Sequence, residues 1–257
     1  MTLSQPAFDT LKNQILYTDL LTLCGALPSQ SVDMILCDLP YGTTACSWDS
    51  IIPLEPMWEQ FKRVIKPRGA IVLTASQPFT SKLVMSNPEM FRCEWIWEKA
   101  QATGFLNIDH KPLKAHENIL IFADGLTTYN PQMTTGKPYK AVTGEKPRNT
   151  IRDKNIGGAV RINDGTRYPR SVQFFVNDIG LHPTQKPVAL FEYLIRTYTQ
   201  PGELVLDPCI GSGTTAIAAR QTGRHFIGGD ITLEYVNIAR ARLAKPYTPP
   251  LFLDEAV

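Results

Sequence analysis

One short segment places an acid, a proline turn and an aromatic ring directly after an apolar run. The run 32–37 is followed by Asp38-Leu39-Pro40-Tyr41. The carboxylate and the carbonyls of the turn can accept hydrogen bonds from an amino group, and the tyrosine ring can stack on a planar ligand. The segment is therefore a candidate amine-binding site. The structural alternative is a strand-ending Asx turn with a packed tyrosine.

A second candidate is a glycine loop between an apolar run and a helical pattern. Residues 204–206 lead into Asp207-Pro208-Cys209-Ile210-Gly211-Ser212-Gly213-Thr214-Thr215, and another acid, Asp230, ends the next apolar run. Glycine lets a backbone turn tightly and approach a ligand closely. The loop lacks the third glycine of the dinucleotide fingerprint and the Gly-Lys-Ser/Thr ending of a phosphate loop. A nucleoside ligand without a pyrophosphate suits it, and a plain strand-to-helix turn is the alternative.

The stretch 125–181 is locally basic. It contains nine Lys or Arg against four Asp or Glu, a balance of +5 in a chain whose net charge is +2. Its residues show little periodicity, and it is too long for an ordinary loop. A basic stretch on a near-neutral chain favours contact with a polyanion, although a solvated loop has the same composition. We expect an inserted functional module here.

Apolar runs and amphipathic patterns alternate through the rest of the chain. This alternation predicts a mostly parallel α/β sheet covered by helices on both faces. Asp19, Asp38, Asp207 and Asp230 each end a predicted strand, so we expect them at the edge where open α/β sheets bind ligands. The expected strands are 14–18, 32–37, 70–74, 91–97, 117–123, 203–206 and 225–228. The expected helices are 20–27, 55–65, 78–85, 188–198, 214–221 and 233–243.

Length and composition limit the class of protein. The chain has 257 residues, 43% of them hydrophobic, which suits one α/β domain with an insertion or two small domains. No run of about 18 apolar residues predicts a membrane span, and residues 1–10 lack the features of a signal peptide, so we expect a cytoplasmic protein. The five cysteines have no paired spacing, which argues against a zinc site and a disulfide framework. We expect no bound metal.

Together the motifs resemble those of amino-group DNA methyltransferases. Residues 38–41 resemble the catalytic tetrapeptide of that family, and residues 207–215 resemble its S-adenosylmethionine loop. His182-Pro183-Thr184-Gln185-Lys186-Pro187 resembles a segment before that loop in the β class, in which the motif order is permuted: tetrapeptide, target recognition, cofactor binding. The resemblance covers residues 14–243. It departs from the common pattern at Leu39, where proline is usual, and at Asp230, where glutamate is usual.

The resemblance implies a Rossmann-like S-adenosylmethionine-dependent methyltransferase fold with a seven-stranded sheet. It divides the chain into a catalytic half (1–124), a target-recognition insert (125–181), a cofactor-binding half (182–245) and a tail (246–257). The implied catalytic residues are Asp38, Leu39, Pro40 and Tyr41. The implied cofactor contacts are Asp19, His182, Thr184, Lys186, Asp207, Pro208, Gly211, Gly213, Thr214 and Asp230. In the insert, the expected DNA contacts are Lys137, Lys140, Lys146, Arg161, Asn163 and Arg167.

The implied reaction moves a methyl group from S-adenosylmethionine to the exocyclic amino group of a base flipped out of double-stranded DNA. The Asp38 carboxylate and the Leu39 carbonyl would hold the amino hydrogens, so catalysis needs positioning and no covalent intermediate. Enzymes that act on cytosine N4 more often carry serine at the place of Asp38, which favours adenine N6. Cys209 lies in the cofactor loop, so we expect no nucleophilic role for it.

Several alternatives stay open at this point. They are methylation of cytosine N4, of RNA or of protein glutamine, and a nucleotide-binding module without catalysis. The insert could also form a homodimer in place of contacting DNA.

Overall fold

The computed structural model describes residues 3–42, 51–142, 160–177 and 185–246. The chain divides into two compact units, one made of 1–130 with 171–257 and the other of 131–170. The smaller unit lies inside the predicted insert 125–181. No helix among the described residues is long and apolar enough to cross a membrane.

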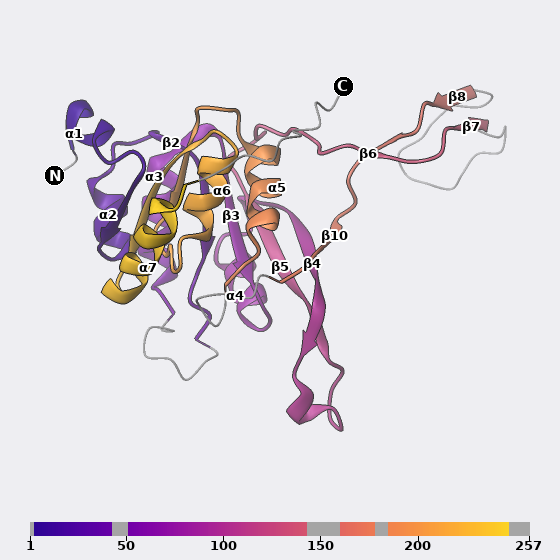
Figure 1. Cartoon of the computed structure of the whole chain (residues 1–257), viewed down its shortest axis with the longest axis horizontal. Coiled ribbons are helices and arrows are strands. Elements are labelled where there is room, and N and C mark those ends of the chain that lie inside the picture. Colours follow the sequence, from indigo (N-terminus) through magenta and orange to yellow (C-terminus); the bar gives the residue numbers. More distant parts are fainter. Residues whose placement is uncertain (1–2, 43–50, 143–159, 178–184, 247–257) are drawn as a thin grey trace. The chain divides into compact units, whose positions relative to one another are not determined.

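An eight-stranded sheet forms the centre of the larger unit (Figure 1). Its strands are β1 (Gln14–Tyr17), β2 (Val32–Asp38), β3 (Ile65–Ala75), β4 (Phe91–Thr103), β5 (Lys114–Phe122), β10 (Val172–Phe175), β11 (Leu204–Asp207) and β12 (His225–Asp230). They lie in the order β1-β12-β11-β2-β3-β5-β4-β10. Among these strands only β5 runs antiparallel to its neighbours, so the predicted, mostly parallel sheet is confirmed.

The seven predicted strands are all present, and the sheet has one more than expected. The additional strand, β10, pairs in parallel with β4 in a part of the chain for which the sequence predicted no strand. Val172 and Phe174 of β10 are exposed, and its other two side chains are only partly buried. A strand at the sheet edge that buries so little apolar surface needs no continuous apolar run, so the residue pattern did not indicate it.

Helices cover both faces of the sheet. They are α1 (Gln5–Asp9), α2 (Leu20–Ala26), α3 (Leu54–Val64), α4 (Phe79–Ser86), α5 (Val188–Tyr198), α6 (Thr214–Gln221) and α7 (Leu233–Ala244). Side chains of α2, α3 and α4 pack in one core cluster with Ile35 and Cys37, and those of α5, α6 and α7 pack in another with Met34 and Leu36. Successive residues of β2 thus point to opposite faces, as the period of a strand requires.

After β11 and after β2, the chain continues toward opposite edges of the sheet. These two strands are parallel neighbours, with Val205 opposite Met34 and Leu206 opposite Ile35. From β11 the chain crosses through α6 to β12, and from β2 it crosses through α3 to β3 on the other side. Because α6 and α3 cover opposite faces, a crevice opens between the carboxyl ends of the two strands.

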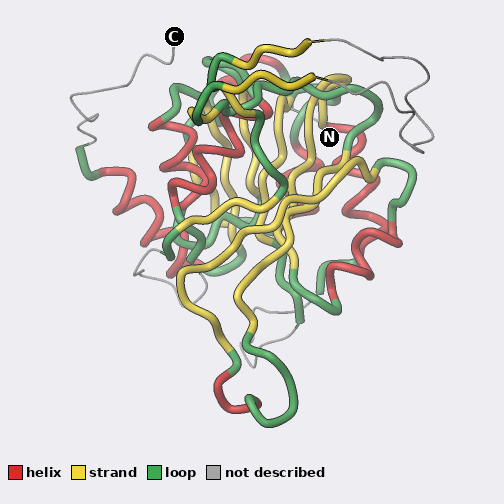
Figure 2. Tube along the Cα trace, turned by 90° about the vertical axis from the view of Figure 1, so that its right-hand side faces the viewer, coloured by secondary structure: helices red, strands yellow, loops and turns green. Residues whose placement is uncertain are grey.

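Strands β4 and β5 form a hairpin that extends beyond the sheet (Figure 2). Residues 104–113 join them and include one 3₁₀ turn, η1 (Phe105–Asn107). Gly104 begins this turn with φ at +98°, a conformation that glycine adopts without strain.

The smaller unit consists of two short antiparallel strand pairs. β6 (Thr134–Thr135) pairs with β9 (Thr166–Arg167), and β7 (Tyr139–Val142) pairs with β8 (Val160–Asn163). The guanidinium of Arg167 donates to the side chain of Asn163 and to the carbonyl of Lys137, and it lies 4.8 Å from the ring of Tyr139. Two of the predicted DNA contacts, Arg167 and Asn163, therefore hold the ends of these strands together.

The other predicted DNA contacts are four basic residues of the insert. Lys137, Lys140 and Arg161 have exposed side chains. Lys146 lies outside the described residues.

Candidate active site

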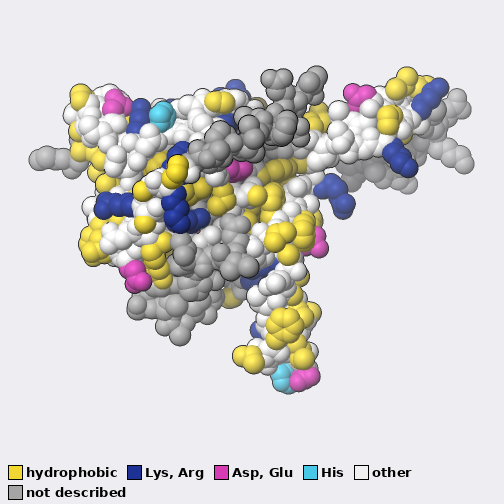
Figure 3. All heavy atoms as spheres, viewed as in Figure 1, with side chains coloured by type: hydrophobic (Ala, Val, Ile, Leu, Met, Phe, Trp, Pro, Cys, Tyr) yellow, Lys and Arg dark blue, Asp and Glu magenta, His cyan; other side chains and the backbone are white. Residues whose placement is uncertain are grey.

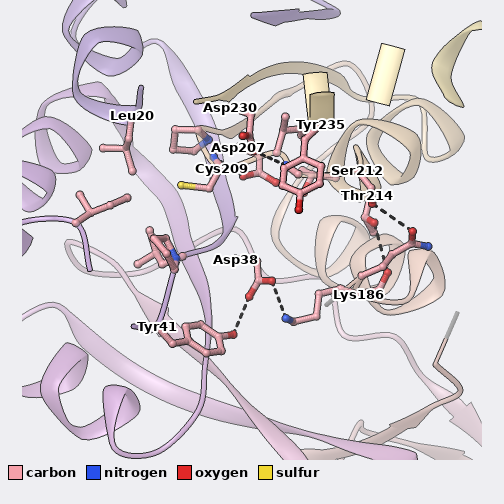
Figure 4. Close-up of a pocket in the computed structure, with 18 of the residues that line it drawn as sticks. Leu20, Asp38, Tyr41, Lys186, Asp207, Cys209, Ser212, Thr214, Asp230 and Tyr235 are labelled. Atoms are coloured by element: carbon pink, nitrogen blue, oxygen red, sulfur yellow. Dashed lines mark hydrogen bonds and ion pairs between the residues drawn. The ribbon is translucent and has the colours of Figure 1, made fainter. Parts of the chain in front are cut away.

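A cavity of about 740 Å³ opens at the carboxyl ends of the sheet strands (Figure 4). The predicted site residues that line it are Asp19, Asp38, Leu39, Pro40, Tyr41, Lys186, Asp207, Pro208, Gly211, Thr214 and Asp230. They come from both ends of the sequence and meet because β1, β2, β11 and β12 end at the same edge. His182 and Thr184 lie outside the described residues. Among the described part of the chain, no group of His, Cys, Asp or Glu could hold a metal ion.

Asp207 anchors the glycine loop at the end of β11. Its carboxyl group is buried and accepts hydrogen bonds from the Thr215 hydroxyl and from the backbone N–H of Cys209, the latter at 3.1 Å. Burial raises the pKa of Asp207 to about 7, although both donors act in the opposite direction. The acid therefore fixes the shape of the loop from inside.

Asp230 ties the same loop to the end of β12. One carboxylate oxygen accepts from the backbone N–H of Gly211 at 2.9 Å, and the other accepts from Thr232 at 2.8 Å. A third acid, Asp19, caps the first turn of α2 by accepting from the N–H of Thr22 at 2.9 Å, and this contact lowers its pKa. Three carboxylates thus face one half of the cavity from neighbouring strand ends.

Gly213, a predicted cofactor contact, also has a role in packing. It caps α6 with φ at +88°, and it does not line the cavity. A Cβ atom at this position would lie 2.8 Å from the Cβ of Ala239 in α7. Only a residue without a side chain lets the two helices approach this closely.

Asp38 lies in the other half of the cavity, where three donors hold its carboxylate. The Tyr41 hydroxyl donates to one oxygen at 2.7 Å, and the Thr74 hydroxyl of β3 donates to the same oxygen. Lys186 Nζ donates to the other oxygen at 2.6 Å. Figure 4 shows Asp38 between Tyr41 and Lys186, with its side chain directed into the cavity. The carboxylate is therefore oriented before any ligand binds.

Lys186 belongs to a buried chain of charges. Its ammonium group lies 3.4 Å from Glu117 Oε2 of β5, and Glu117 also forms an ion pair with Lys99 of β4. Burial opposes the charge of Lys186, but Asp38 and Glu117 together outweigh this effect and raise its pKa. Burial likewise raises the pKa of Glu117, and the facing lysines more than compensate, so that its pKa is lowered. Both groups therefore stay ionised.

Tyr41 is fixed by its neighbours. Its ring stacks on Phe79 of α4, with 5.5 Å between centroids and 25° between planes, and Lys186 Nζ lies 5.6 Å from its centroid. Burial raises the pKa of its hydroxyl well above the usual value, so the hydroxyl is a donor to Asp38 at neutral pH.

Comparison of the sequence with known proteins identifies the family of this chain. Residues 32–241 match the N6/N4 methyltransferase family, described as DNA methylase. Type II methyltransferase M.HpaI of Haemophilus parainfluenzae is 30% identical over 243 residues, which cover 89% of this chain and 73% of that protein. The chain belongs to the N6/N4 family of DNA methylases. DNA adenine methyltransferase YhdJ of Escherichia coli K12 is 26% identical to this methylase over 249 residues, covering 89% and 82% of the two chains.

Solved structures share the fold of this methylase. M1.HpyAVI, in a complex with S-adenosylmethionine, aligns with a TM-score of 0.60 at 22% identity, covering 90% of this chain and 99% of that one. The cytosine-N4-specific PvuII DNA methyltransferase aligns with a TM-score of 0.65 at 15% identity, covering 91% and 87%. The predicted Rossmann-like methyltransferase fold is confirmed.

Several cavity residues of the methylase were not predicted from the sequence. Lys99 and Trp97 come from β4, Lys114 and Glu117 from β5, and Ser76 follows β3. The Lys114 ammonium donates to the Ser76 hydroxyl, and burial lowers the pKa of Lys114. A charged residue close to a large aromatic one, as in the sequence 97–99, is the signal that could have indicated these positions, because a buried charge needs a partner.

Proposed function

We propose that this methylase transfers a methyl group from S-adenosylmethionine to N6 of adenine in double-stranded DNA. The observation that carries the proposal is the Asp38 carboxylate, which three donors hold at the wall of the cavity. By resemblance, cytosine-N4 enzymes more often carry serine at this place. The relative YhdJ is itself a DNA adenine methyltransferase.

One half of the cavity suits S-adenosylmethionine. The volume of the whole cavity is in the range of small-molecule sites, and its lining combines apolar side chains such as Leu20 and Ile52 with acceptors. Asp230 would accept from the ribose hydroxyls and Asp19 from the adenine amino group, since both carboxylates line the cavity. When bound, the cofactor supplies an electrophilic methyl group. M1.HpyAVI, which shares the fold, is known as a complex with this molecule.

The other half of the cavity suits a flipped base. A carboxylate can accept about four hydrogen bonds, and Asp38 receives three from the protein, which leaves capacity for an amino hydrogen. The Leu39 carbonyl is the second proposed acceptor. Two acceptors on the amino hydrogens would direct the nitrogen lone pair out of conjugation with the ring and toward the methyl group. Tyr41 would contact the face of the base.

Beside the cofactor contact that the sequence suggested, we propose a second role for Lys186. Its ammonium compensates the charge of Asp38 in a buried place and fixes one of the two carboxylate oxygens. Glu117 and Lys99 in turn hold Lys186. We therefore assign Lys186 as a positioning residue for Asp38.

The insert 125–181 is the proposed DNA-contacting module. Exposed Lys137, Lys140 and Arg161 are free to approach phosphates or base edges, with Lys146 added from the sequence. Arg167 and Asn163 are bonded to one another, so we propose that they maintain the shape of this module. The domain boundaries inferred from the sequence are part of the same proposal.

Modification-sensitive sequencing of DNA from cells that express the methylase tests the proposal. We expect N6-methyladenine in a single sequence context, and strongly reduced methylation of that context in cells that express Asp38→Ala. N4-methylcytosine in its place would refute the choice of base. Unmodified DNA, together with methylated RNA or protein, would refute the choice of substrate.

A further inference from the structure

The end of the β4–β5 hairpin exposes large apolar side chains. Phe105, Leu106 and Ile108 are 66%, 99% and 58% exposed, and Leu113 is 38% exposed. Figure 3 shows hydrophobic side chains toward the end of this arm. Within the structure these side chains bury little surface, so they contribute little to the stability of the fold. Apolar groups that gather on a projecting arm mark a surface that another molecule covers.

The arm begins at the rim of the active-site cavity. Trp97, Lys99 and Thr103 of β4 and Lys114 of β5 line that cavity, and the apolar residues lie between Thr103 and Lys114. Because a strand rises about 3.3 Å per residue, residues 97–103 run for about 20 Å along the cavity wall. Any molecule that inserts a group into the cavity from this side passes the arm.

We infer that the apolar tip of this arm, Phe105 with Leu106, is a wedge that enters the DNA beside the target base and takes its place in the stack. This inference rests on the proposed function, because only a substrate in a duplex needs such a wedge. Phe, Leu and Ile are the residue types that proteins insert between base steps. Lys111, near the end of the arm, has an exposed side chain and can approach a phosphate beside the point of insertion.

The physical reason for a wedge lies in the cost of flipping. Taking a base out of the duplex costs a few kcal/mol of stacking and pairing, and the cost is smallest for an unpaired base. An apolar side chain that fills the gap left by the flipped base restores part of the lost stacking. It stabilises only the state in which the base is flipped out, because the gap exists only there. The wedge therefore acts on paired targets and has little to do where the target is already unpaired.

The test compares two DNA substrates with the variant Phe105→Ser/Leu106→Ser. Both duplexes carry the recognition sequence found by sequencing, one with a normal base pair at the target and one with the target opposite an abasic site. The exposed positions allow folding of the variant, which thermal denaturation verifies. Met85→Ser is the matched control, because Met85 is an apolar side chain in α4, outside residues 104–113, and is 73% exposed.

Expected is a fall in kcat/KM of at least about tenfold on the paired duplex and less than about threefold on the unpaired one, with Met85→Ser unchanged on both. Equal losses on both duplexes, or no loss on either, would overturn the wedge. Equal losses with a changed sedimentation velocity would assign the tip to self-association instead. If wild-type protein methylates neither duplex, the proposed function itself fails, and this outcome is distinct from a failure of the wedge.

Discussion

Replacing Glu117 with Gln should make methyl transfer sensitive to alkaline pH. Burial lowers the pKa of Lys186, but the carboxylates of Asp38 and Glu117 hold it above the ordinary value of 10.5. Wild-type Lys186 is therefore charged through the working range of the enzyme. Glutamine keeps the size of the side chain and removes one of the two charges, so the pKa of Lys186 falls. Methyl transfer should then be lost as pH rises through the lowered pKa, because neutral Lys186 no longer compensates Asp38.

The size of the effect follows from the geometry. Two unit charges at the 3.4 Å between Lys186 Nζ and Glu117 Oε2 attract one another by about 5 kcal/mol at an effective dielectric constant of about 20. Lys99 and Lys114 also face Glu117, so both then repel Lys186 without compensation. The lost attraction and the repulsion by the two lysines all favour the neutral form of Lys186.

The assay measures kcat at saturating cofactor and DNA from about pH 6.5 to about pH 9.5. Glu117→Gln should lie within about threefold of wild type at the acidic end and at least about tenfold below it at the alkaline end. Glu117→Asp, which keeps the charge, should show the smaller alkaline loss. A Glu117→Gln profile parallel to that of wild type would refute the role of Lys186.

The remaining predictions concern cofactor, packing and DNA. Asp38→Ala should keep S-adenosylmethionine binding in calorimetry and lower methyl transfer by about 100-fold. Asp230→Ala should instead weaken cofactor binding. A folded Asp38→Ala protein that no longer binds the cofactor contradicts the assignment of Asp38 to the target base. Gly213→Ala should lower the free energy of unfolding by about 2–4 kcal/mol through clash and strain, and Gly223→Ala, which has positive φ but no neighbour within 4 Å, by about 1 kcal/mol. Equal losses in thermal denaturation would count against the clash. Neutralising three lysines of the insert together should weaken binding to every DNA sequence and flatten the salt dependence of binding in fluorescence anisotropy. An unchanged salt dependence, together with loss of a dimer in sedimentation velocity, would favour the dimer alternative. The three lysines are Lys137, Lys140 and Lys146.

The strand ends that line the cavity could be predicted from the sequence. Asp38, Asp207 and Asp230 each follow an apolar run, and carboxyl ends of parallel strands share one edge of a sheet. The partners of Asp38 could not be predicted in the same way. Lys186 is 148 residues away in the chain, and the local pattern of residues 182–187 indicates only that they precede the cofactor loop.

The direction of β5 explains why Glu117 was missed. This strand runs antiparallel to β3, so its first residues, and not its last, lie at the edge with the other strand ends. The alternation of apolar residues predicts a strand and carries no information on its direction. The length of the hairpin was missed for a related reason, since the side chains of residues 98–103 in β4 are mostly exposed and show no apolar alternation.

The central claim is that this DNA methylase modifies adenine N6 through the positioned carboxylate of Asp38. Its most direct test supplies purified protein with duplex DNA and S-adenosylmethionine that carries a deuterated methyl group, digests the DNA to nucleosides and separates them by mass spectrometry. The account predicts labelled N6-methyldeoxyadenosine with wild-type protein and about 100-fold less in the same time with Asp38→Ala that still binds the cofactor. Label in N4-methyldeoxycytidine, or equal label in adenine with Asp38→Ala, would contradict it.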